Sequence, residues 1–169
     1  MQNIEFKCEL RDRELADAVC RRLGAVHVAT LEQTDTYFRI PDGRLKRREC
    51  VGEPTEWIFY SREDMSRPRV SRFTLYSDDE ARERFGERPL PVWVVVSKTR
   101  DLWLKGAVRI HLDRVDGLGE FFELEAMVSK KHNAGRCQKS IDELRAAFGP
   151  ALGEPISRSY SDLIAAESV

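Results

Sequence analysis

Charged side chains recur two residues apart in several short segments of this chain. In an extended strand, residues i and i+2 project from the same face, so each group would present its charges side by side. The groups are Glu5 and Lys7, Lys46 and Arg48, Tyr60 and Arg62, Lys98 and Arg100, Arg109 with His111 and Asp113, and Glu123 and Glu125. The middle segments supply almost only cations, and the first and last segments supply carboxylates.

This combination suits an anionic ligand that carries a metal. Lys and Arg donate charge-assisted hydrogen bonds to phosphate oxygens, and Arg can donate two at once. Clustered carboxylates without neighbouring His or Cys ligands are hard oxygen donors for Mg²⁺ or Mn²⁺. If the two sets lie together, they would bind a metal-chelated polyphosphate. Without such an anion, the inward cations would repel one another.

The segments that carry these residues are typical of strands. Alternating runs cover residues 3–10, 34–40, 44–51, 56–63, 69–77, 91–100, 106–115 and 119–128. Turn-forming residues such as Pro41-Asp42-Gly43 separate several runs, which indicates hairpins and therefore antiparallel pairing. The spacing also predicts helices between Asp12 and Gly24 and over residues 78–86, 136–148 and 157–166.

Two arrangements of the polar strand faces remain open. One is an ordinary sheet with an apolar core face and a solvated polar face. The other is a closed barrel whose polar faces line a shared cavity, while helices cover apolar residues such as Phe6 and Leu124. The separation of cations from carboxylates favours the barrel, because a solvated face usually mixes the two signs. We expect an α+β fold: an eight-stranded antiparallel β-barrel, or tunnel, with a charged interior and flanking helices.

Composition excludes several functional classes. The 169 residues predict one domain over 1–169, and Lys+Arg 28 against Asp+Glu 29 argues against a nucleic-acid partner that needs a broad basic surface. No apolar run approaches the ~20 residues of a membrane helix, and the N-terminal residues do not resemble a signal peptide. We therefore expect a cytoplasmic protein with no membrane partner. The sequence leaves its oligomeric state open, with a homodimer as one option.

The same residues resemble those of the CYTH superfamily, the triphosphate tunnel metalloenzymes. This superfamily includes class IV adenylyl cyclases, thiamine triphosphatases and inorganic triphosphatases. The matching motifs are an ExExK-like Asn3-Ile4-Glu5-Phe6-Lys7, Gln33 to Phe38, Gly43 to Glu49, Lys98-Thr99-Arg100, Arg109 to Asp113, Glu123-Leu124-Glu125 and Ser159 to Leu163. The resemblance implies phosphate contacts from Lys7, Lys46, Arg48, Arg62, Lys98, Arg100 and Arg109. It implies metal ligation of Mg²⁺ or Mn²⁺ by Glu5, Asp113, Glu123 and Glu125.

These expectations describe a metal-dependent enzyme that acts on a triphosphate compound, such as ATP, inorganic triphosphate or thiamine triphosphate. For hydrolysis, Glu5 or Glu123 is the catalytic candidate that would orient the attacking water. For cyclisation of a nucleotide, the ribose 3′-hydroxyl would attack the α-phosphorus and release pyrophosphate. The fold alone does not choose between these reactions.

Asn3 departs from the family pattern, which has a glutamate at this position. Its carbonyl oxygen can still bind a hard cation, but one negative charge is lost. This favours the alternative function, a non-catalytic sensor of polyphosphate or a nucleotide. For His111 on the tunnel face, we expect a structural hydrogen bond rather than proton transfer. Removing Lys98 or Arg100 is expected to weaken triphosphate binding and to leave the fold intact or more stable.

Overall fold

The computed structural model describes residues 1–62 and 68–167, and the side chains over the same ranges except that of Arg62. Its helices and strands follow in the order β1 (Gln2–Leu10), α1 (Arg13–Arg22), β2 (Val26–Phe38), β3 (Arg44–Cys50), β4 (Glu56–Arg62), β5 (Arg69–Tyr76), α2 (Asp78–Phe85), β6 (Val92–Lys105), β7 (Val108–Val115), β8 (Gly119–Met127), α3 (Ala134–Phe148), a 3₁₀ turn (Gly149–Ala151), β9 (Leu152–Pro155) and α4 (Tyr160–Glu167).

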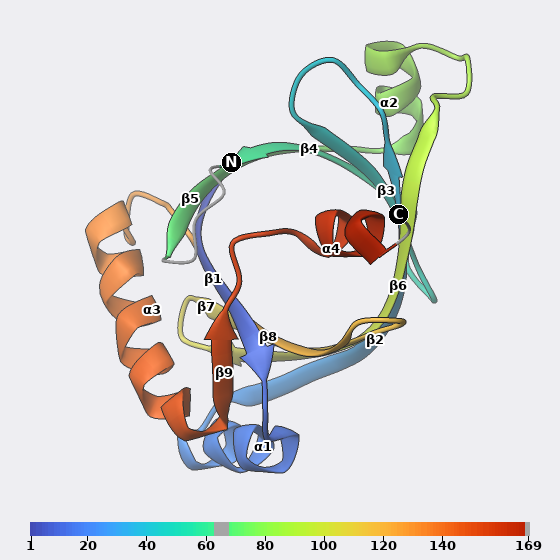
Figure 1. The fold of residues 1–169 in the computed structure, drawn as a ribbon. Helices are drawn as coiled ribbons and strands as arrows, with labels where there is room; N and C mark the ends of the chain where they lie inside the picture. Colours follow the sequence, from blue (N-terminus) through green and yellow to red (C-terminus); the bar gives the residue numbers. More distant parts are fainter. Residues whose placement is uncertain (63–67, 168–169) are drawn as a thin grey trace.

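Eight antiparallel strands close into a barrel, as the sequence predicts. The strand order is β5-β4-β3-β2-β6-β7-β8-β1, and β5 also pairs with β1 to complete the ring (Figure 1). At this closure Glu5 lies opposite Arg69. The short strand β9 adds to the other end of β1, where Leu10 faces Leu152. Closure makes the inward-facing residues of all eight strands neighbours around one central volume.

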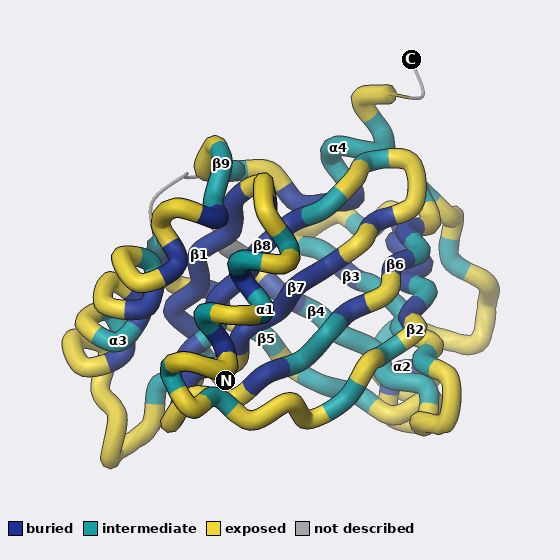
Figure 2. The backbone as a smooth tube through the Cα atoms, turned by 90° about the horizontal axis from the view of Figure 1, so that it is seen from below, coloured by how far each residue is buried: buried dark blue, intermediate teal, exposed yellow. Residues whose placement is uncertain are grey.

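The main hydrophobic core lies outside the barrel wall, beneath α1 and α3. Figure 2 shows that β1, β7 and β8 are the most continuously buried strands. Their outward-facing residues include Phe6, Ile110 and Phe122, which pack against Cys20 of α1 and Ile141 of α3. The alternation of these strands therefore buries apolar residues under the helices and leaves the alternate, polar residues to the tunnel.

Helix α4 closes one mouth of the tunnel. In Figure 1 it lies within the outline of the ring of strands, and Figure 2 shows it at one end of the barrel. Its residues Tyr160, Leu163 and Ile164 belong to a second apolar cluster, which includes Tyr37 and Phe121 of the barrel. The helix is also tied to β3, because Arg44 donates two hydrogen bonds to Asp162, of 2.8 and 3.2 Å.

The barrel differs from the sequence prediction mainly at strand ends. β2 begins at Val26 and β6 continues to Lys105, so both strands are longer than their predicted runs. β9 was not predicted, and α4 begins at Tyr160. The last residue of the predicted run 56–63 lies outside the described residues. Within the described part of the chain, no helix has the length and apolar character needed to cross a bilayer.

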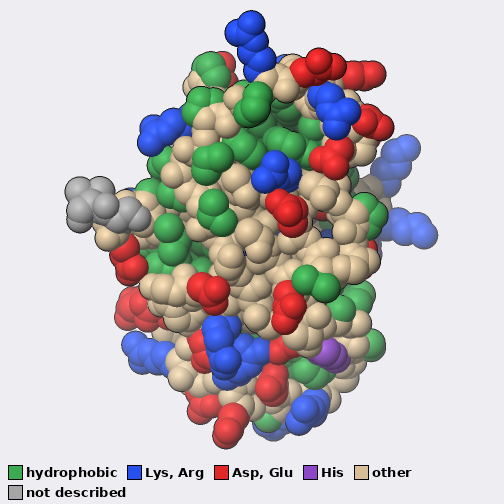
Figure 3. All heavy atoms as spheres, turned by 90° about the vertical axis from the view of Figure 1, so that its right-hand side faces the viewer, with side chains coloured by type: hydrophobic (Ala, Val, Ile, Leu, Met, Phe, Trp, Pro, Cys, Tyr) green, Lys and Arg blue, Asp and Glu red, His purple; other side chains and the backbone are tan. Residues whose placement is uncertain are grey.

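The outer surface and the interior carry their charges differently. Figure 3 shows Lys and Arg interspersed with Asp and Glu over the face that carries β6. Inside the barrel, cations gather on β3 and β6, and carboxylates gather on β1 and β8. The sorting of charge by sign is thus a property of the tunnel.

Candidate functional site

A cavity of about 1030 Å³ occupies the barrel, and most of the sequence-predicted site residues line it. These residues are Glu5, Lys7, Lys46, Arg48, Lys98, Arg100, Arg109, Glu123 and Glu125. Arg109 is exposed, whereas Asp113 is fully buried and does not line the cavity. Arg62 ends β4, and its side chain lies outside the described part of the structure.

Asp35 of β2 is the centre of the cation wall. Arg48 of β3 donates two hydrogen bonds of 2.8 Å to its carboxylate, and the Lys98 Nζ of β6 lies 2.9 Å from Oδ2. The Lys46 Nζ lies 3.5 Å from the same oxygen. Burial raises the pKa of Asp35, but the charges of Arg48, Lys98 and Lys46 outweigh it and hold the pKa well below its usual range. One carboxylate therefore contacts three inward cations and offsets part of their charge.

Lys98 is the most strongly perturbed of these cations. Burial and the nearby charges of Arg48, Arg100 and Lys46 lower its pKa to about 7, against the opposing pull of Asp35. The side chain also lies near the Tyr160 ring, with Nζ 5.7 Å from the ring centroid. An additional anion beside Lys98 would favour the protonated amine.

The carboxylate wall is built on β1 and β8. Glu5 lies opposite Glu125 in the strand register, and Lys7 lies opposite Glu123. Glu123 also faces His111 of β7, with 2.8 Å between Glu123 Oε1 and His111 Nδ1. Lys7 Nζ lies 3.7 Å from Glu123 Oε2. These contacts bring three carboxylates and one imidazole to the same part of the tunnel.

The neighbouring carboxylates Glu123 and Glu125 have opposite tendencies to ionise. Burial raises the pKa of Glu123, but Lys7, His111 and Arg100 outweigh it and hold the pKa well below its usual value. Burial and the charges of Glu123 and Glu5 raise the pKa of Glu125 to about 8. Clustered carboxylates that repel one another are a favourable place for a cation.

Asp113 does not join the cluster of Glu5, Glu123 and Glu125, because its carboxylate is bound by other side chains. Arg100 donates two hydrogen bonds of 2.8 Å to its carboxylate, and the Tyr160 hydroxyl donates a third of 2.8 Å. Burial raises the pKa of Asp113, but Arg100 outweighs it and brings the pKa to about 2. In this arrangement Asp113 orients Arg100 and connects α4 to the tunnel wall.

The sequence interpretation missed three members of the site. The charge pattern of the strands does not point to Asp35 or Arg69, and it places His111 on the tunnel face without linking it to the metal carboxylates. Asp35 shares its strand face with Gln33 and Tyr37, so alternation within β2 could have placed it in the tunnel. Arg69 lies 3.4 Å from Glu5 Oε1 through its Nε, a contact that depends on barrel closure.

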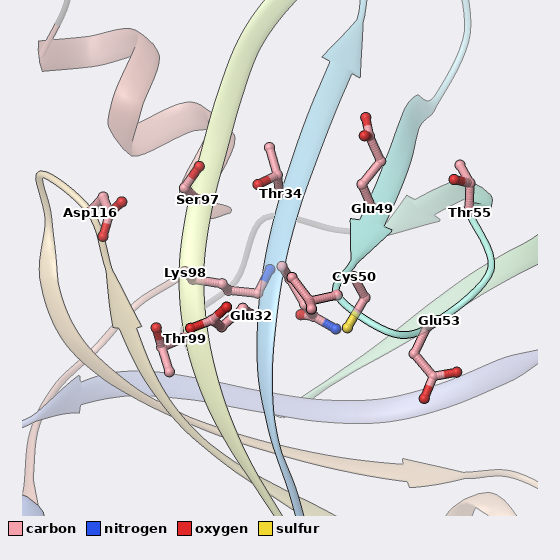
Figure 4. Close-up of a pocket in the computed structure, with 12 residues that line it drawn as sticks. Glu32, Thr34, Glu49, Cys50, Glu53, Thr55, Ser97, Lys98, Thr99 and Asp116 are labelled. Carbon is pink, nitrogen blue, oxygen red and sulfur yellow. The ribbon is translucent and has the colours of Figure 1, made fainter.

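A second cavity of about 630 Å³ lies where β3 ends beside β2 (Figure 4). It shares Cys50, Glu53 and Lys98 with the tunnel, and Figure 4 shows Lys98 extending from β6 across β2. Its other charged lining residues are acidic, including Glu32 and Glu49. A phosphate group would be repelled there, so the tunnel is the better candidate site.

The donor set of the carboxylate wall fits a divalent cation. Among the residues that the structure describes, His111, Glu123 and Glu125 can each offer one ligand atom, and these atoms lie within 4.8 Å of one another. Glu5 adjoins this group across the β1–β8 pairing. Carboxylate oxygens suit Mg²⁺ and Mn²⁺, and an imidazole nitrogen is a good ligand for transition metals.

Known proteins are similar to this chain in sequence or in fold. A protein of Methanocaldococcus jannaschii, provisionally named an adenylate cyclase, is 23% identical, and the match covers 96% of this chain and 98% of that protein. A solved Pyrococcus horikoshii structure is 24% identical, with a TM-score of 0.76 and 95% and 98% coverage of the two chains. A Hippeastrum protein, provisionally an adenylyl cyclase and described as having a dominant triphosphatase activity, has a TM-score of 0.64 at 12% identity, with 99% and 96% coverage.

The family assignment rests on the sequence itself. The model of the CYTH domain matches residues 1–160, which include every strand of the barrel and the start of α4. The chain belongs to the CYTH domain family.

Proposed function

We propose that this protein hydrolyses the terminal phosphate of a triphosphate compound in its tunnel, with the help of a divalent cation. One observation carries the proposal. One cavity inside the barrel brings Lys46, Arg48, Lys98 and Arg100 from β3 and β6 together with Glu5, Glu123 and Glu125 from β1 and β8. A phosphate chain and its metal need this pairing of cations with carboxylates.

The cations would bind and orient the phosphate chain. Arg48 and Arg100 are each held by a buried carboxylate, Asp35 and Asp113, and their positions are therefore fixed before a ligand arrives. Lys98 and Lys46 extend the same wall and would neutralise charge on the phosphate oxygens. Lys7, beside Glu123, would contribute a further positive charge.

The carboxylates would hold the metal and position the water. Glu5, Glu123 and Glu125 are the proposed metal carboxylates, and a bound divalent cation supplies electrostatic stabilisation of the charge that develops on the phosphoryl group. Glu5 and Glu123 are the candidates to accept the proton of the attacking water. The bond from the terminal phosphorus to the bridging oxygen breaks, which releases orthophosphate and a diphosphate.

The test is to incubate the protein with inorganic triphosphate or ATP and with Mg²⁺ or Mn²⁺, and to measure the products. We expect orthophosphate, and we expect Glu125→Gln to lower the rate at least about a hundredfold. Glu120→Gln is the matched control, because Glu120 lies on the same strand but pairs with Arg13 and Arg114 outside the tunnel. Full activity of Glu125→Gln, or no turnover by the native protein, contradicts the proposal.

Asn3 supports a second candidate, a non-catalytic sensor of polyphosphate or a nucleotide. It lines the tunnel in place of a carboxylate and is 9% exposed. Tight binding of inorganic triphosphate without product, unchanged in Asn3→Glu, would support the sensor. Pyrophosphate and a cyclic nucleotide from ATP would instead support cyclisation.

A further inference from the structure

His111 is placed among the carboxylates by the pairing of β7 with β8. It lies directly opposite Glu123 in the strand register and projects into the tunnel, where it is 4% exposed. Its Nδ1 is 2.8 Å from Glu123 Oε1. One ring nitrogen also lies within 4.8 Å of the ligand atoms offered by Glu123 and Glu125. The residue thus stands where a metal held by these carboxylates would meet it.

We propose that the metal site of the tunnel is a mixed nitrogen and oxygen site, in which His111 is a ligand beside Glu123 and Glu125 and which selects Mn²⁺ over Mg²⁺. The inference rests on the proposed function only for the presence of a divalent cation in the tunnel. It adds a ligand and a preference between these two metals.

The preference follows from the chemistry of the donors. Mg²⁺ binds almost entirely through oxygen, demands near-ideal octahedral geometry and gives up its water reluctantly. Mn²⁺ also prefers oxygen donors, but as a first-row transition metal it accepts an imidazole nitrogen more readily than Mg²⁺ does. The nearby Asn3 offers a neutral amide oxygen in place of a carboxylate, so the tunnel has one fewer hard anionic donor. The imidazole therefore moves the site away from Mg²⁺, and the missing charge at Asn3 leaves the site more dependent on this ligand.

The charges around the cluster also favour a neutral ligand. Arg100 Nη2 and Lys7 Nζ each lie 3.7 Å from a Glu123 oxygen, and Arg69 pairs with Glu5. These cations neutralise part of the charge that would hold a dication. A neutral imidazole strengthens the coordination without a further buried carboxylate, which would be repelled by the three acidic residues.

The experiment measures metal binding without any substrate. Mn²⁺ is titrated into the protein and followed by electron paramagnetic resonance, and electron spin echo modulation then reports a nitrogen bonded directly to the bound Mn²⁺. The chain has 3 histidines, so a His27→Gln and His132→Gln double variant leaves His111 as the one imidazole. His111→Gln replaces the ring nitrogen with an amide, and Mg²⁺ competition gives the ratio of the two metal affinities.

We expect the nitrogen signal in the native protein and in the double variant, and its loss in His111→Gln. The preference for Mn²⁺ over Mg²⁺ should fall about tenfold or more in His111→Gln. Bound Mn²⁺ without a nitrogen signal in the native protein or the double variant overturns the inference, and so does the absence of Mn²⁺ binding. Both of these results are obtained without a substitution at His111, so they do not depend on the folding of His111→Gln. A nitrogen signal in a protein that does not hydrolyse triphosphate would refute the proposed function and leave this inference standing.

Discussion

Asp35 determines how three cations can share the interior of one barrel. It is 0% exposed and accepts from Arg48 and Lys98, with Lys46 close by. Removing one partner of a buried ion network leaves uncompensated charge, which typically costs about 3–5 kcal/mol. We expect Asp35→Asn to lower the free energy of unfolding in urea by this amount. Asp116→Asn, at an exposed aspartate, is the control, and equal stability of the two variants would contradict the prediction.

The structure reverses one expectation from the sequence. The row of inward cations predicted that removing Arg100 would leave the fold intact or more stable. Arg100 instead binds the fully buried Asp113 through two hydrogen bonds. Its removal would leave that carboxylate with the Tyr160 hydroxyl alone among the hydrogen bonds described for it, so Arg100→Met is expected to be destabilising. Counting charges on strands cannot find such counterions, because Arg100 and Asp113 come from different strands.

Lys98 gives the stability of the protein a dependence on pH. Burial, with Arg48, Arg100 and Lys46, lowers the pKa of Lys98 from 10.5 to about 7. Between these values the unfolded chain holds a proton on Lys98 that the folded protein lacks, so the contribution of Lys98 to stability rises with pH across this window. Lys98 should add about 2 kcal/mol between pH 7 and pH 9.

The measurement for Lys98 is urea unfolding at pH 7 and pH 9. Lys98→Met should lose this increment, whereas Lys139→Met, at an exposed lysine of α3, should keep it. The same increment in native protein and Lys98→Met would show that the amine stays charged inside the tunnel at neutral pH.

Among the helices, α4 is held over the tunnel mouth partly by polar contacts. Asp162 accepts two hydrogen bonds from Arg44 and one from the Ser159 hydroxyl, which in turn caps the backbone of the helix. We expect Asp162→Asn to weaken the docking of α4 by about 1 kcal/mol, because these groups are partly exposed. Amide exchange over residues 160–167 should then be roughly fivefold faster.

Asp142→Asn in α3 is the matched control for this exchange experiment. Asp142 accepts one hydrogen bond from Gln138 on the helix surface, so its loss should leave α4 unaffected. If exchange in β1 and β8 accelerates as much as in α4, then Asp162 stabilises the whole barrel rather than its closure by the helix.

The strands that are easiest to predict from the sequence are those that lie between the helix-covered core and the tunnel. β1, β7 and β8 have apolar residues under the helices and charged residues in the tunnel, so their alternation is strong. Residues 26–33 of β2 carry no such pattern, because this half of the strand is largely exposed and is defined by its pairing with β6. β9 has four residues and is defined by its pairing with β1. Strands that depend on such pairing cannot be predicted from the local sequence.

In the whole molecule, closure of the ring of strands brings the charged residues of different strands around one cavity. The sorting of cations and carboxylates onto different strands favours a barrel from the sequence alone. The pairing of β5 with β1 could not be foreseen, because neither strand shows which edge it will meet. That closure brings Arg69 to Glu5 and encloses the cavity. The charges of distant strands then line one cavity.

Arg47 and Arg48 offer a direct comparison of the outside of the barrel with its inside. They are neighbours on β3, but Arg48 faces the tunnel, whereas Arg47 lies against the rings of Phe38 and Trp57 and pairs with Glu49. A ligand at a hundred times its dissociation constant stabilises a protein by about 2.7 kcal/mol. Inorganic triphosphate with Mn²⁺ should therefore raise the free energy of unfolding of the native protein by this amount.

The two arginine variants should differ in the free energy of unfolding that is gained on adding the ligand. This comparison does not depend on how stable each variant is without the ligand. Arg47→Met should keep most of the increment, and Arg48→Met should lose most of it, because Arg48 would donate two hydrogen bonds to phosphate. Orthophosphate at the same concentration should stabilise much less, since it reaches fewer of the tunnel cations. Equal increments for the two variants would mean that the anion binds to the outer surface, and the sorting of charge inside the barrel would then need another explanation.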